Sequence, residues 1–208
     1  MHFGITGPGA GYRAAFAVLL IPAMLALLFL WSARGIEPDA AVAKVTRTDF
    51  DARYYRYMAF SVVTVMGFAH FILVAFHLQL THRLPPALIP VLFGLAMGTD
   101  AIGSIVAGRL FDRYGLKVLY VLPVITLPTL PLLFLSVQPV WIWIGAALWG
   151  LALGIQESTV RAGVATLTPD ALRGTAYGLF DTVFGAAWLG GSVMLGALYA
   201  IGVQWLVI

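Results

Sequence analysis

Gly-Arg-Leu-Phe-Asp-Arg-Tyr-Gly-Leu-Lys, residues 108–117, is a short charged segment between two long apolar runs. It places one acid, three bases and two glycines within ten residues of a chain that otherwise avoids charge. A tight loop at a membrane surface needs glycine for its turn and fixed charges at the boundary with water. The segment therefore predicts a tight charged turn between two membrane-spanning helices.

The composition places the whole chain in a lipid bilayer. Of its 208 residues, 61% are hydrophobic and only 10% are charged, whereas a soluble domain carries about 25% charged residues. The net charge of +3 does not indicate a nucleic-acid partner, because the bases lie between apolar runs and form no continuous basic face. The chain has no cysteine, which excludes disulfides, thiolate metal sites and cysteine nucleophiles.

Six apolar segments are long enough to cross a membrane, which takes about 20 helical residues. They are residues 14–33, 57–80, 86–108, 118–137, 140–160 and 174–199. Backbone in lipid must satisfy its own hydrogen bonds, so each segment is expected to be a helix. The predicted fold is an all-α integral membrane bundle, and residues 201–208 begin a further apolar run.

The distribution of bases predicts the orientation of these segments. Ten bases lie after the first, third and fifth segments: Arg34, Lys44, Arg47, Arg53, Arg56, Arg109, Arg113, Lys117, Arg161 and Arg173. The opposite side holds only Arg13 and Arg83. The positive-inside rule places the larger set in the cytoplasm. The longest polar segment, residues 34–55, then also lies there, and the spacing of Thr48 and Asp51 predicts a helix start near Asp49.

At this point the sequence resembles a known family. The pattern G-x-L-x-D-R-x-G-x-K, typical of the major facilitator superfamily, is carried by Gly108, Leu110, Asp112, Arg113, Gly115 and Lys117. In that family two six-span halves are joined by a long cytoplasmic loop, and the motif recurs between the eighth and ninth spans. The resemblance implies that the chain is a fragment comprising the sixth to eleventh spans.

The same register implies a domain organisation. Residues 1–33 would hold the end of the fifth span and the sixth span, residues 34–55 the central loop, and residues 56–208 the C-terminal half with a truncated last helix. The six-span N-terminal half would be the missing partner. Two further segments resemble the family: residues 173–180 look like the start of the eleventh span of bacterial carriers, and residues 4–11 weakly resemble the Gly-Pro motif of drug and proton antiporters.

Charged residues inside the apolar segments are expected to have a structural or functional role, because a charge near mid-membrane costs on the order of 3 kcal/mol. Glu157 and Arg161 are four residues apart, the spacing of an ion pair within a helix. We expect Asp112, Arg113, Glu157, Arg161 and Arg173 to form a cytoplasmic gate that pairs when the inside is closed. The alternative is static neutralisation at helix ends.

Other polar residues are candidates for coupling and for substrate contact. Asp100 and Asp181 could exchange protons, although buried acids often serve structure instead. His70 and His77 are seven residues apart and are expected to share a helix face. With Gln156 they are expected to line a cavity rather than bind metal. Glycines at 145, 150, 154, 178, 185, 191 and 196 are expected to let helices approach closely.

The leading functional hypothesis is a secondary transporter that moves a small molecule, with proton-coupled efflux as the expected mode and without a cofactor. The expected location is the inner membrane of a bacterium. A non-transporting scaffold or receptor derived from a carrier is a second hypothesis. An intramembrane enzyme is a third, but the sequence shows no nucleophile–base arrangement and no H-E-x-x-H pattern.

Overall fold

The computed structural model describes residues 10–32 and 50–207. The chain divides into two units, Met1–Ala43 and Lys44–Ile208, and each unit is described by itself. The division lies within residues 34–55, the predicted central loop, most of which is outside the described residues. Thr48, one of the two residues whose spacing predicted the helix start, and Asp49, the predicted start, are outside them too.

The described residues of the first unit form one helix, α1 (Ala10–Ser32), which corresponds to the predicted segment 14–33. At 1.5 Å per residue its 23 residues extend about 34 Å, enough to cross a bilayer. Apolar side chains lie on all sides of this helix, among them Phe29 and Leu30. A helix that is apolar on all sides is typical of a segment that faces lipid.

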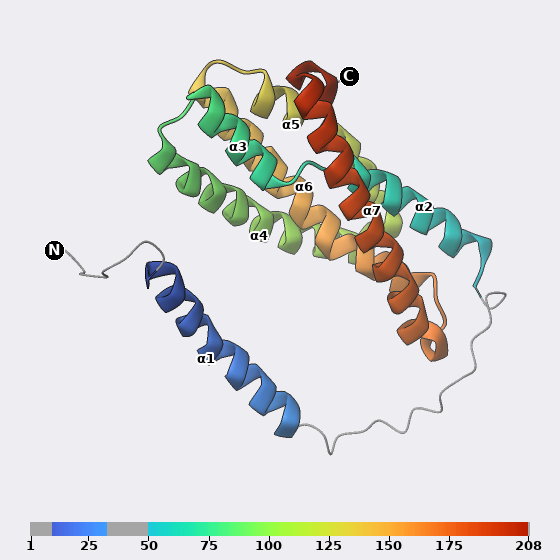
Figure 1. Ribbon diagram of the computed structural model, residues 1–208. Helices are drawn as coiled ribbons and strands as arrows, with labels where there is room; N and C mark the ends of the chain where they lie inside the picture. Colours follow the sequence, from blue (N-terminus) through green and yellow to red (C-terminus); the bar gives the residue numbers. More distant parts are fainter. Residues whose placement is uncertain (1–9, 33–49, 208) are drawn as a thin grey trace. The chain divides into compact units, whose positions relative to one another are not determined.

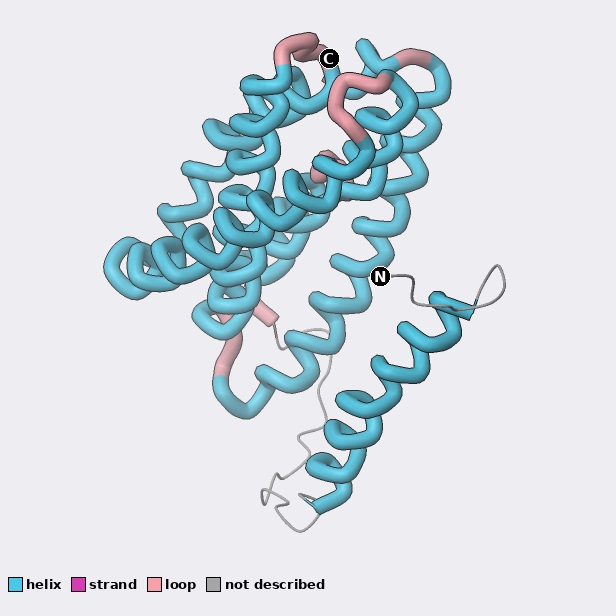
Figure 2. The backbone as a smooth tube through the Cα atoms, turned by 90° about the vertical axis from the view of Figure 1, so that its left-hand side faces the viewer, coloured by secondary structure: helices cyan, strands magenta, loops and turns pink. Residues whose placement is uncertain are grey.

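The second unit is a bundle of helices (Figure 1). The α-helices are α2 (Ala52–Met66), α3 (Phe71–Thr81), α4 (Ile89–Tyr114), α5 (Val121–Phe134), α6 (Pro139–Thr166) and α7 (Arg173–Ile201). Short 3-10 helices are η3 (Pro86–Leu88), η4 (Gly115–Tyr120), η5 (Asp170–Leu172) and η6 (Val203–Leu206). The described residues contain no strand (Figure 2), so the predicted all-α fold is confirmed.

Within residues 10–32 and 50–207, four helical segments are long and apolar enough to cross a membrane, and Leu20–Ser32 is a shorter apolar one. The protein is therefore an integral, multi-pass membrane protein. The segment Pro86–Phe134 has 49 residues and contains two of the predicted spans. Arg83, before α4, donates hydrogen bonds to the carbonyl oxygens of Phe134, at 3.2 Å, and Ser136, after α5. The chain must therefore reverse within this segment, and α4 and α5 are antiparallel.

The reversal takes place at Gly115, whose φ of +60° is in the region that favours glycine. The predicted turn is thus present, but it is shorter than the charged segment suggested. Residues 108–114 are helical and form the last two turns of α4, since that helix ends at Tyr114. Most of the motif is therefore the end of α4, and the chain changes direction at Gly115.

The predicted continuous span 57–80 is broken. Helix α2 ends at Met66, and α3 begins at Phe71 after a short non-helical segment (Figure 1). The start of α2 is also later than predicted, at Ala52, where the Asp51 side chain accepts a hydrogen bond from the backbone N–H of Arg53 at 3.4 Å. We call residues 67–70 the α2–α3 break.

Tyrosine hydroxyls fix the first half of α2 to α6 and α7. Tyr54 donates to the Ala176 carbonyl oxygen at 2.8 Å, and Tyr57 donates to the Val160 carbonyl oxygen at 2.9 Å. Both tyrosines are buried. These bonds join the start of α2 to α6 and to the start of α7.

Glycines bring α4 and α6 into backbone contact. A Cβ atom at Gly150 would collide with the Ala96 carbonyl oxygen, and one at Gly154 would collide with the Asp100 carbonyl oxygen. On α7 only Gly191 of the predicted positions is close to another helix, at Met66. Gly178, Gly185 and Gly196 have no atom of the described second unit within 4 Å of an added Cβ, so they make no close helix contact within this unit.

Candidate functional site

A small cavity of about 60 Å³ lies between α6, α7 and the α2–α3 break. We call it the α6–α7 pocket, and it is lined by Phe68, Leu153, Gln156, Glu157, Val160, Arg161, Phe180, Asp181, Phe184 and Trp188. All of these residues belong to the second unit. The pocket combines aromatic rings with three ionisable side chains in segments that otherwise are apolar.

One wall of the pocket is a single face of α6. Leu153, Gln156, Glu157, Val160 and Arg161 follow the three- and four-residue spacing that aligns side chains along one side of a helix. Gln156 is only 4% exposed, and its side-chain oxygen has no hydrogen-bond partner among the described residues. A buried amide without a partner costs free energy, so this group is available to a ligand or to water.

The opposite wall is an aromatic stripe on α7. Phe180, Phe184 and Trp188 are four residues apart, and their ring centroids are separated by 5.5 Å and then 5.9 Å. The first two rings are stacked and the second pair is T-shaped. The indole N–H of Trp188 is buried and has no described acceptor. Sequence reasoning missed this stripe, although its four-residue spacing is visible in residues 180–188.

The ion pair in the pocket differs from the predicted one. Arg161 Nε lies 3.8 Å from Asp181 Oδ1, so the contact joins α6 to α7 rather than two turns of α6. Glu157 makes no ion pair within 4.0 Å in the described part of the chain, although Asp100 and Arg161 both lie within electrostatic range of it. The predicted Glu157–Arg161 pair is therefore not formed in this conformation.

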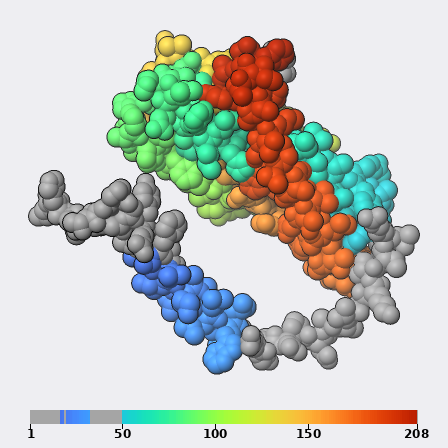
Figure 3. All heavy atoms as spheres, in the orientation of Figure 1, coloured from blue at the N-terminus to red at the C-terminus, as the bar shows by residue number. Residues whose placement is uncertain are grey.

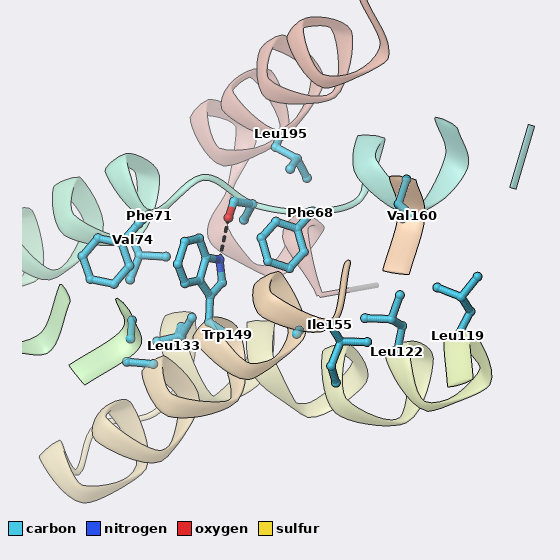
Figure 4. Close-up of a cluster of buried hydrophobic side chains, with 14 of the residues drawn as sticks. Phe68, Phe71, Val74, Leu119, Leu122, Leu133, Trp149, Ile155, Val160 and Leu195 are labelled. Carbon is cyan, nitrogen blue, oxygen red and sulfur yellow. Dashed lines mark hydrogen bonds between the residues drawn. The ribbon is translucent and has the colours of Figure 1, made fainter. Parts of the chain in front are cut away.

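The α2–α3 break lies beside the pocket and is supported by a distant tryptophan. Trp149 of α6 donates its indole N–H to the Ala69 carbonyl oxygen at 2.8 Å, which is the dashed line in Figure 4. This bond gives the Ala69 carbonyl oxygen a donor, which the interrupted helix does not supply. Phe68 packs on Trp149, with the two ring centroids 5.4 Å apart. The break thus directs Phe68 into the aromatic cluster.

The two histidines occupy separate environments because the break lies before α3. His70 precedes α3 and stacks on Trp188, with ring centroids 4.9 Å apart and planes 9° apart. His77 is buried, and its Nδ1 lies 3.0 Å from the Tyr199 hydroxyl. The expected shared helix face is therefore wrong. His70 lines a broader apolar groove between α3 and α7, with Phe76 and Leu189.

Asp100 lies at the contact between α4 and α6. Its neighbour one turn away, Ser104, donates a hydrogen bond to the Gly154 carbonyl oxygen at 3.1 Å. One carboxylate oxygen of Asp100 is buried and has no partner in the described chain. Asp100 and Glu157 thus place two acids near each other across the α4–α6 contact.

The structure places the motif charges apart from the pocket lining. Asp112, Arg113 and Lys117 are exposed, and Arg113 lies 5.4 Å from the ring centroid of Tyr114. Arg173 pairs with Asp170 at 2.8 Å, within one turn of the chain. The described residues contain no ion pair that joins these bases to Glu157 or Asp181. In this conformation the predicted network is therefore not assembled.

No group of three or more His, Cys, Asp or Glu side chains that could hold a metal ion is present in residues 10–32 and 50–207. The side chains that line the pocket can form hydrogen bonds, ion pairs and aromatic contacts.

Comparison with known proteins identifies the family. The family model of the Major Facilitator Superfamily matches residues 3–192. This chain belongs to the Major Facilitator Superfamily. Superfamily members are membrane transporters rather than enzymes. The chain is also 36% identical over 212 residues to uncharacterized proteins of Mycobacterium bovis and Mycobacterium tuberculosis. The match includes 96% of the chain but 51% of each relative, so the chain spans about half their length. No solved structure matches it.

Proposed function

We propose that the whole protein is a secondary transporter that moves small molecules by alternating access, with the α6–α7 pocket as part of its substrate path. The observation that supports this proposal is the gathering of Gln156, Glu157, Arg161 and Asp181 in apolar helices. Ionisable groups inside a membrane are costly and mark substrate or ion paths. In transporters such sites lie beside interrupted helices, as this pocket lies beside the α2–α3 break.

We further propose that this chain corresponds to the C-terminal half, that its partner is a six-span N-terminal half, and that the protein is in the inner membrane of a bacterium. Proton-coupled efflux is the proposed mode. Asp100 and Asp181 are the proposed proton sites: one oxygen of Asp100 has no described partner, and Asp181 has a partner that a conformational change could remove. A scaffold derived from a carrier is the competing function.

The Arg161–Asp181 contact is the proposed closure at the cytoplasmic side of the pocket. We expect Arg161→Ala and Asp181→Asn each to raise the rate at which a Leu153→Cys variant is labelled from the cytoplasm. Leu153 lines the pocket, and the full-length protein would carry no other cysteine. The side chains of the pair are 68% and 50% exposed, so its strength is about 1 kcal/mol at most, or about fivefold in labelling rate.

Exchanging the two charges, Arg161→Asp with Asp181→Arg, should return the labelling rate toward that of the parent. Asp51→Asn is the matched control, because it removes a carboxylate from an ion pair outside the pocket while asparagine still caps α2. A scaffold has no second state toward which it can shift. An equal labelling rate in all variants would therefore contradict the transport proposal.

A further inference from the structure

The α6–α7 pocket carries a net negative charge. Its ionisable groups are Glu157, Asp181 and Arg161, two acids and one base. The base already contacts Asp181 at 3.8 Å, and Asp100 adds further negative charge within electrostatic range of Glu157. Glu157 is thus the one lining carboxylate without a cationic partner within 4.0 Å among the described residues. A ligand with one positive charge would neutralise it.

The rest of the lining suits an aromatic ring. Phe180, Phe184 and Trp188 form a continuous stripe that lines the same pocket as Glu157, and Phe68 of the α2–α3 break adds a further ring. Aromatic faces attract both other rings and cations. The ring of His70 stacks on Trp188 and restricts the orientation of the indole, so this wall is preorganised.

Gln156 supplies an independent indication of a ligand. It is 4% exposed, lines the same pocket, and its side-chain oxygen has no described hydrogen-bond partner. An ammonium group has donors for more than one acceptor, so it can bind the Glu157 carboxylate and the Gln156 oxygen together.

We propose, on the basis of the transport function proposed above, that the substrate is a small aromatic amine in its protonated, singly charged form. Its ammonium group binds Glu157 and Gln156, and its ring lies on Phe180, Phe184 and Trp188. Carboxylate-bearing analogues are disfavoured, because the lining has two acids and one base, and that base lies beside Asp181. Neutral analogues bind through the ring alone.

Equilibrium binding of tritiated 2-phenylethylamine to the 208-residue chain in lipid nanodiscs tests the proposal. 2-Phenylethanol and 3-phenylpropionate, as competitors of the same shape, represent the neutral and anionic forms. We expect the amine to bind at least about tenfold more tightly than the alcohol and the acid not to compete, since tenfold corresponds to about 1.4 kcal/mol.

Two variants identify the groups involved. Glu157→Gln should weaken amine binding about tenfold while leaving the affinity for 2-phenylethanol unchanged, and that unchanged affinity shows that the chain is folded. Trp188→Leu should weaken the binding of both ligands by a similar factor. Asp51→Asn, outside the pocket, should change neither. The proposal is overturned if the amine and the alcohol bind equally, if neither binds, or if Glu157→Gln does not alter the preference for the amine.

This test is separate from that of the transport function. Binding concerns the pocket within the 208-residue chain, whereas the cysteine labelling described above concerns movement of the full-length protein. Labelling that shifts as expected, together with absent amine binding, would retain a transporter and reject its aromatic-amine substrate.

Discussion

Gly154→Leu is expected to prevent normal packing of α4 on α6 and to destabilise the protein by about 3 kcal/mol or more. Inserting side-chain volume into a packed contact costs about 1–3 kcal/mol where neighbouring side chains can adjust. At Gly154 the obstacles are the backbone carbonyl of Asp100 and the backbone nitrogen of Ser104, which cannot rotate away. The hydrogen bond from Ser104 to the Gly154 carbonyl would be lost as the helices separate.

The measurement is the unfolding midpoint of the purified chain in detergent, with size-exclusion chromatography to detect aggregation. Gly98→Leu is the matched control: it makes the same change in α4, where a Cβ has no atom within 4 Å, and adds the same apolar surface. We expect the control to unfold near the parent midpoint. Equal midpoints for the two variants would show that the backbone contact between α4 and α6 does not hold the bundle together.

Trp149→Ala is expected to have the second large effect, a loss of about 3–5 kcal/mol in unfolding free energy, the usual range for a buried aromatic residue. The ring is 5% exposed and packs against Phe68 and Phe71. Its indole N–H also satisfies the Ala69 carbonyl in the α2–α3 break. The substitution would therefore remove both the packing and the hydrogen bond that support the break.

Trp149→Phe separates the two contributions, because it keeps a ring but leaves the Ala69 carbonyl without its donor. Loss of a partner for a buried polar group costs about 1–3 kcal/mol. Trp141→Phe is the control, since Trp141 is 47% exposed. Unfolding is again followed in detergent. A Trp149→Phe chain as stable as the parent would mean that the Ala69 carbonyl does not depend on Trp149.

The helical segments and their order could be predicted from the sequence because each segment carries its own signal. Long apolar runs require helices in lipid, and the bases between them mark the helix ends. Gly115 could be identified as a turn residue for the same reason: its requirement for a positive φ is local. The family resemblance depended on this same short segment.

The break between Met66 and Phe71 could not be predicted, because no proline marks it and Gly67 alone is a weak signal. It depends on Trp149, 80 residues from Ala69, and on the close approach of Gly191 to Met66. The partner of Arg161 was missed for a related reason. Helix geometry alone favours Glu157 as the partner of Arg161, because the two residues are four positions apart. Asp181 becomes the partner only when α7 packs on α6.

The exposed face of α7 leaves a surface that the described chain does not cover. Leu189 and Val193 are 69% and 66% exposed, and α7 runs along the surface of the bundle in Figure 3. Apolar surface of this kind in a membrane protein faces either lipid or another helix. In the proposed carrier, the N-terminal half is the candidate for that neighbour.

The most direct test of alternating access at the α6–α7 pocket is two-sided labelling of Leu153→Cys in the full-length protein with other cysteines replaced. Right-side-out and inside-out vesicles would be treated with a membrane-impermeant maleimide, and the labelling rates compared. A pocket that opens to each side in turn predicts labelling from both sides, with an excess of a bound substrate slowing both rates. Labelling from one side only, whatever ligand or proton gradient is applied, would contradict alternating access at this pocket.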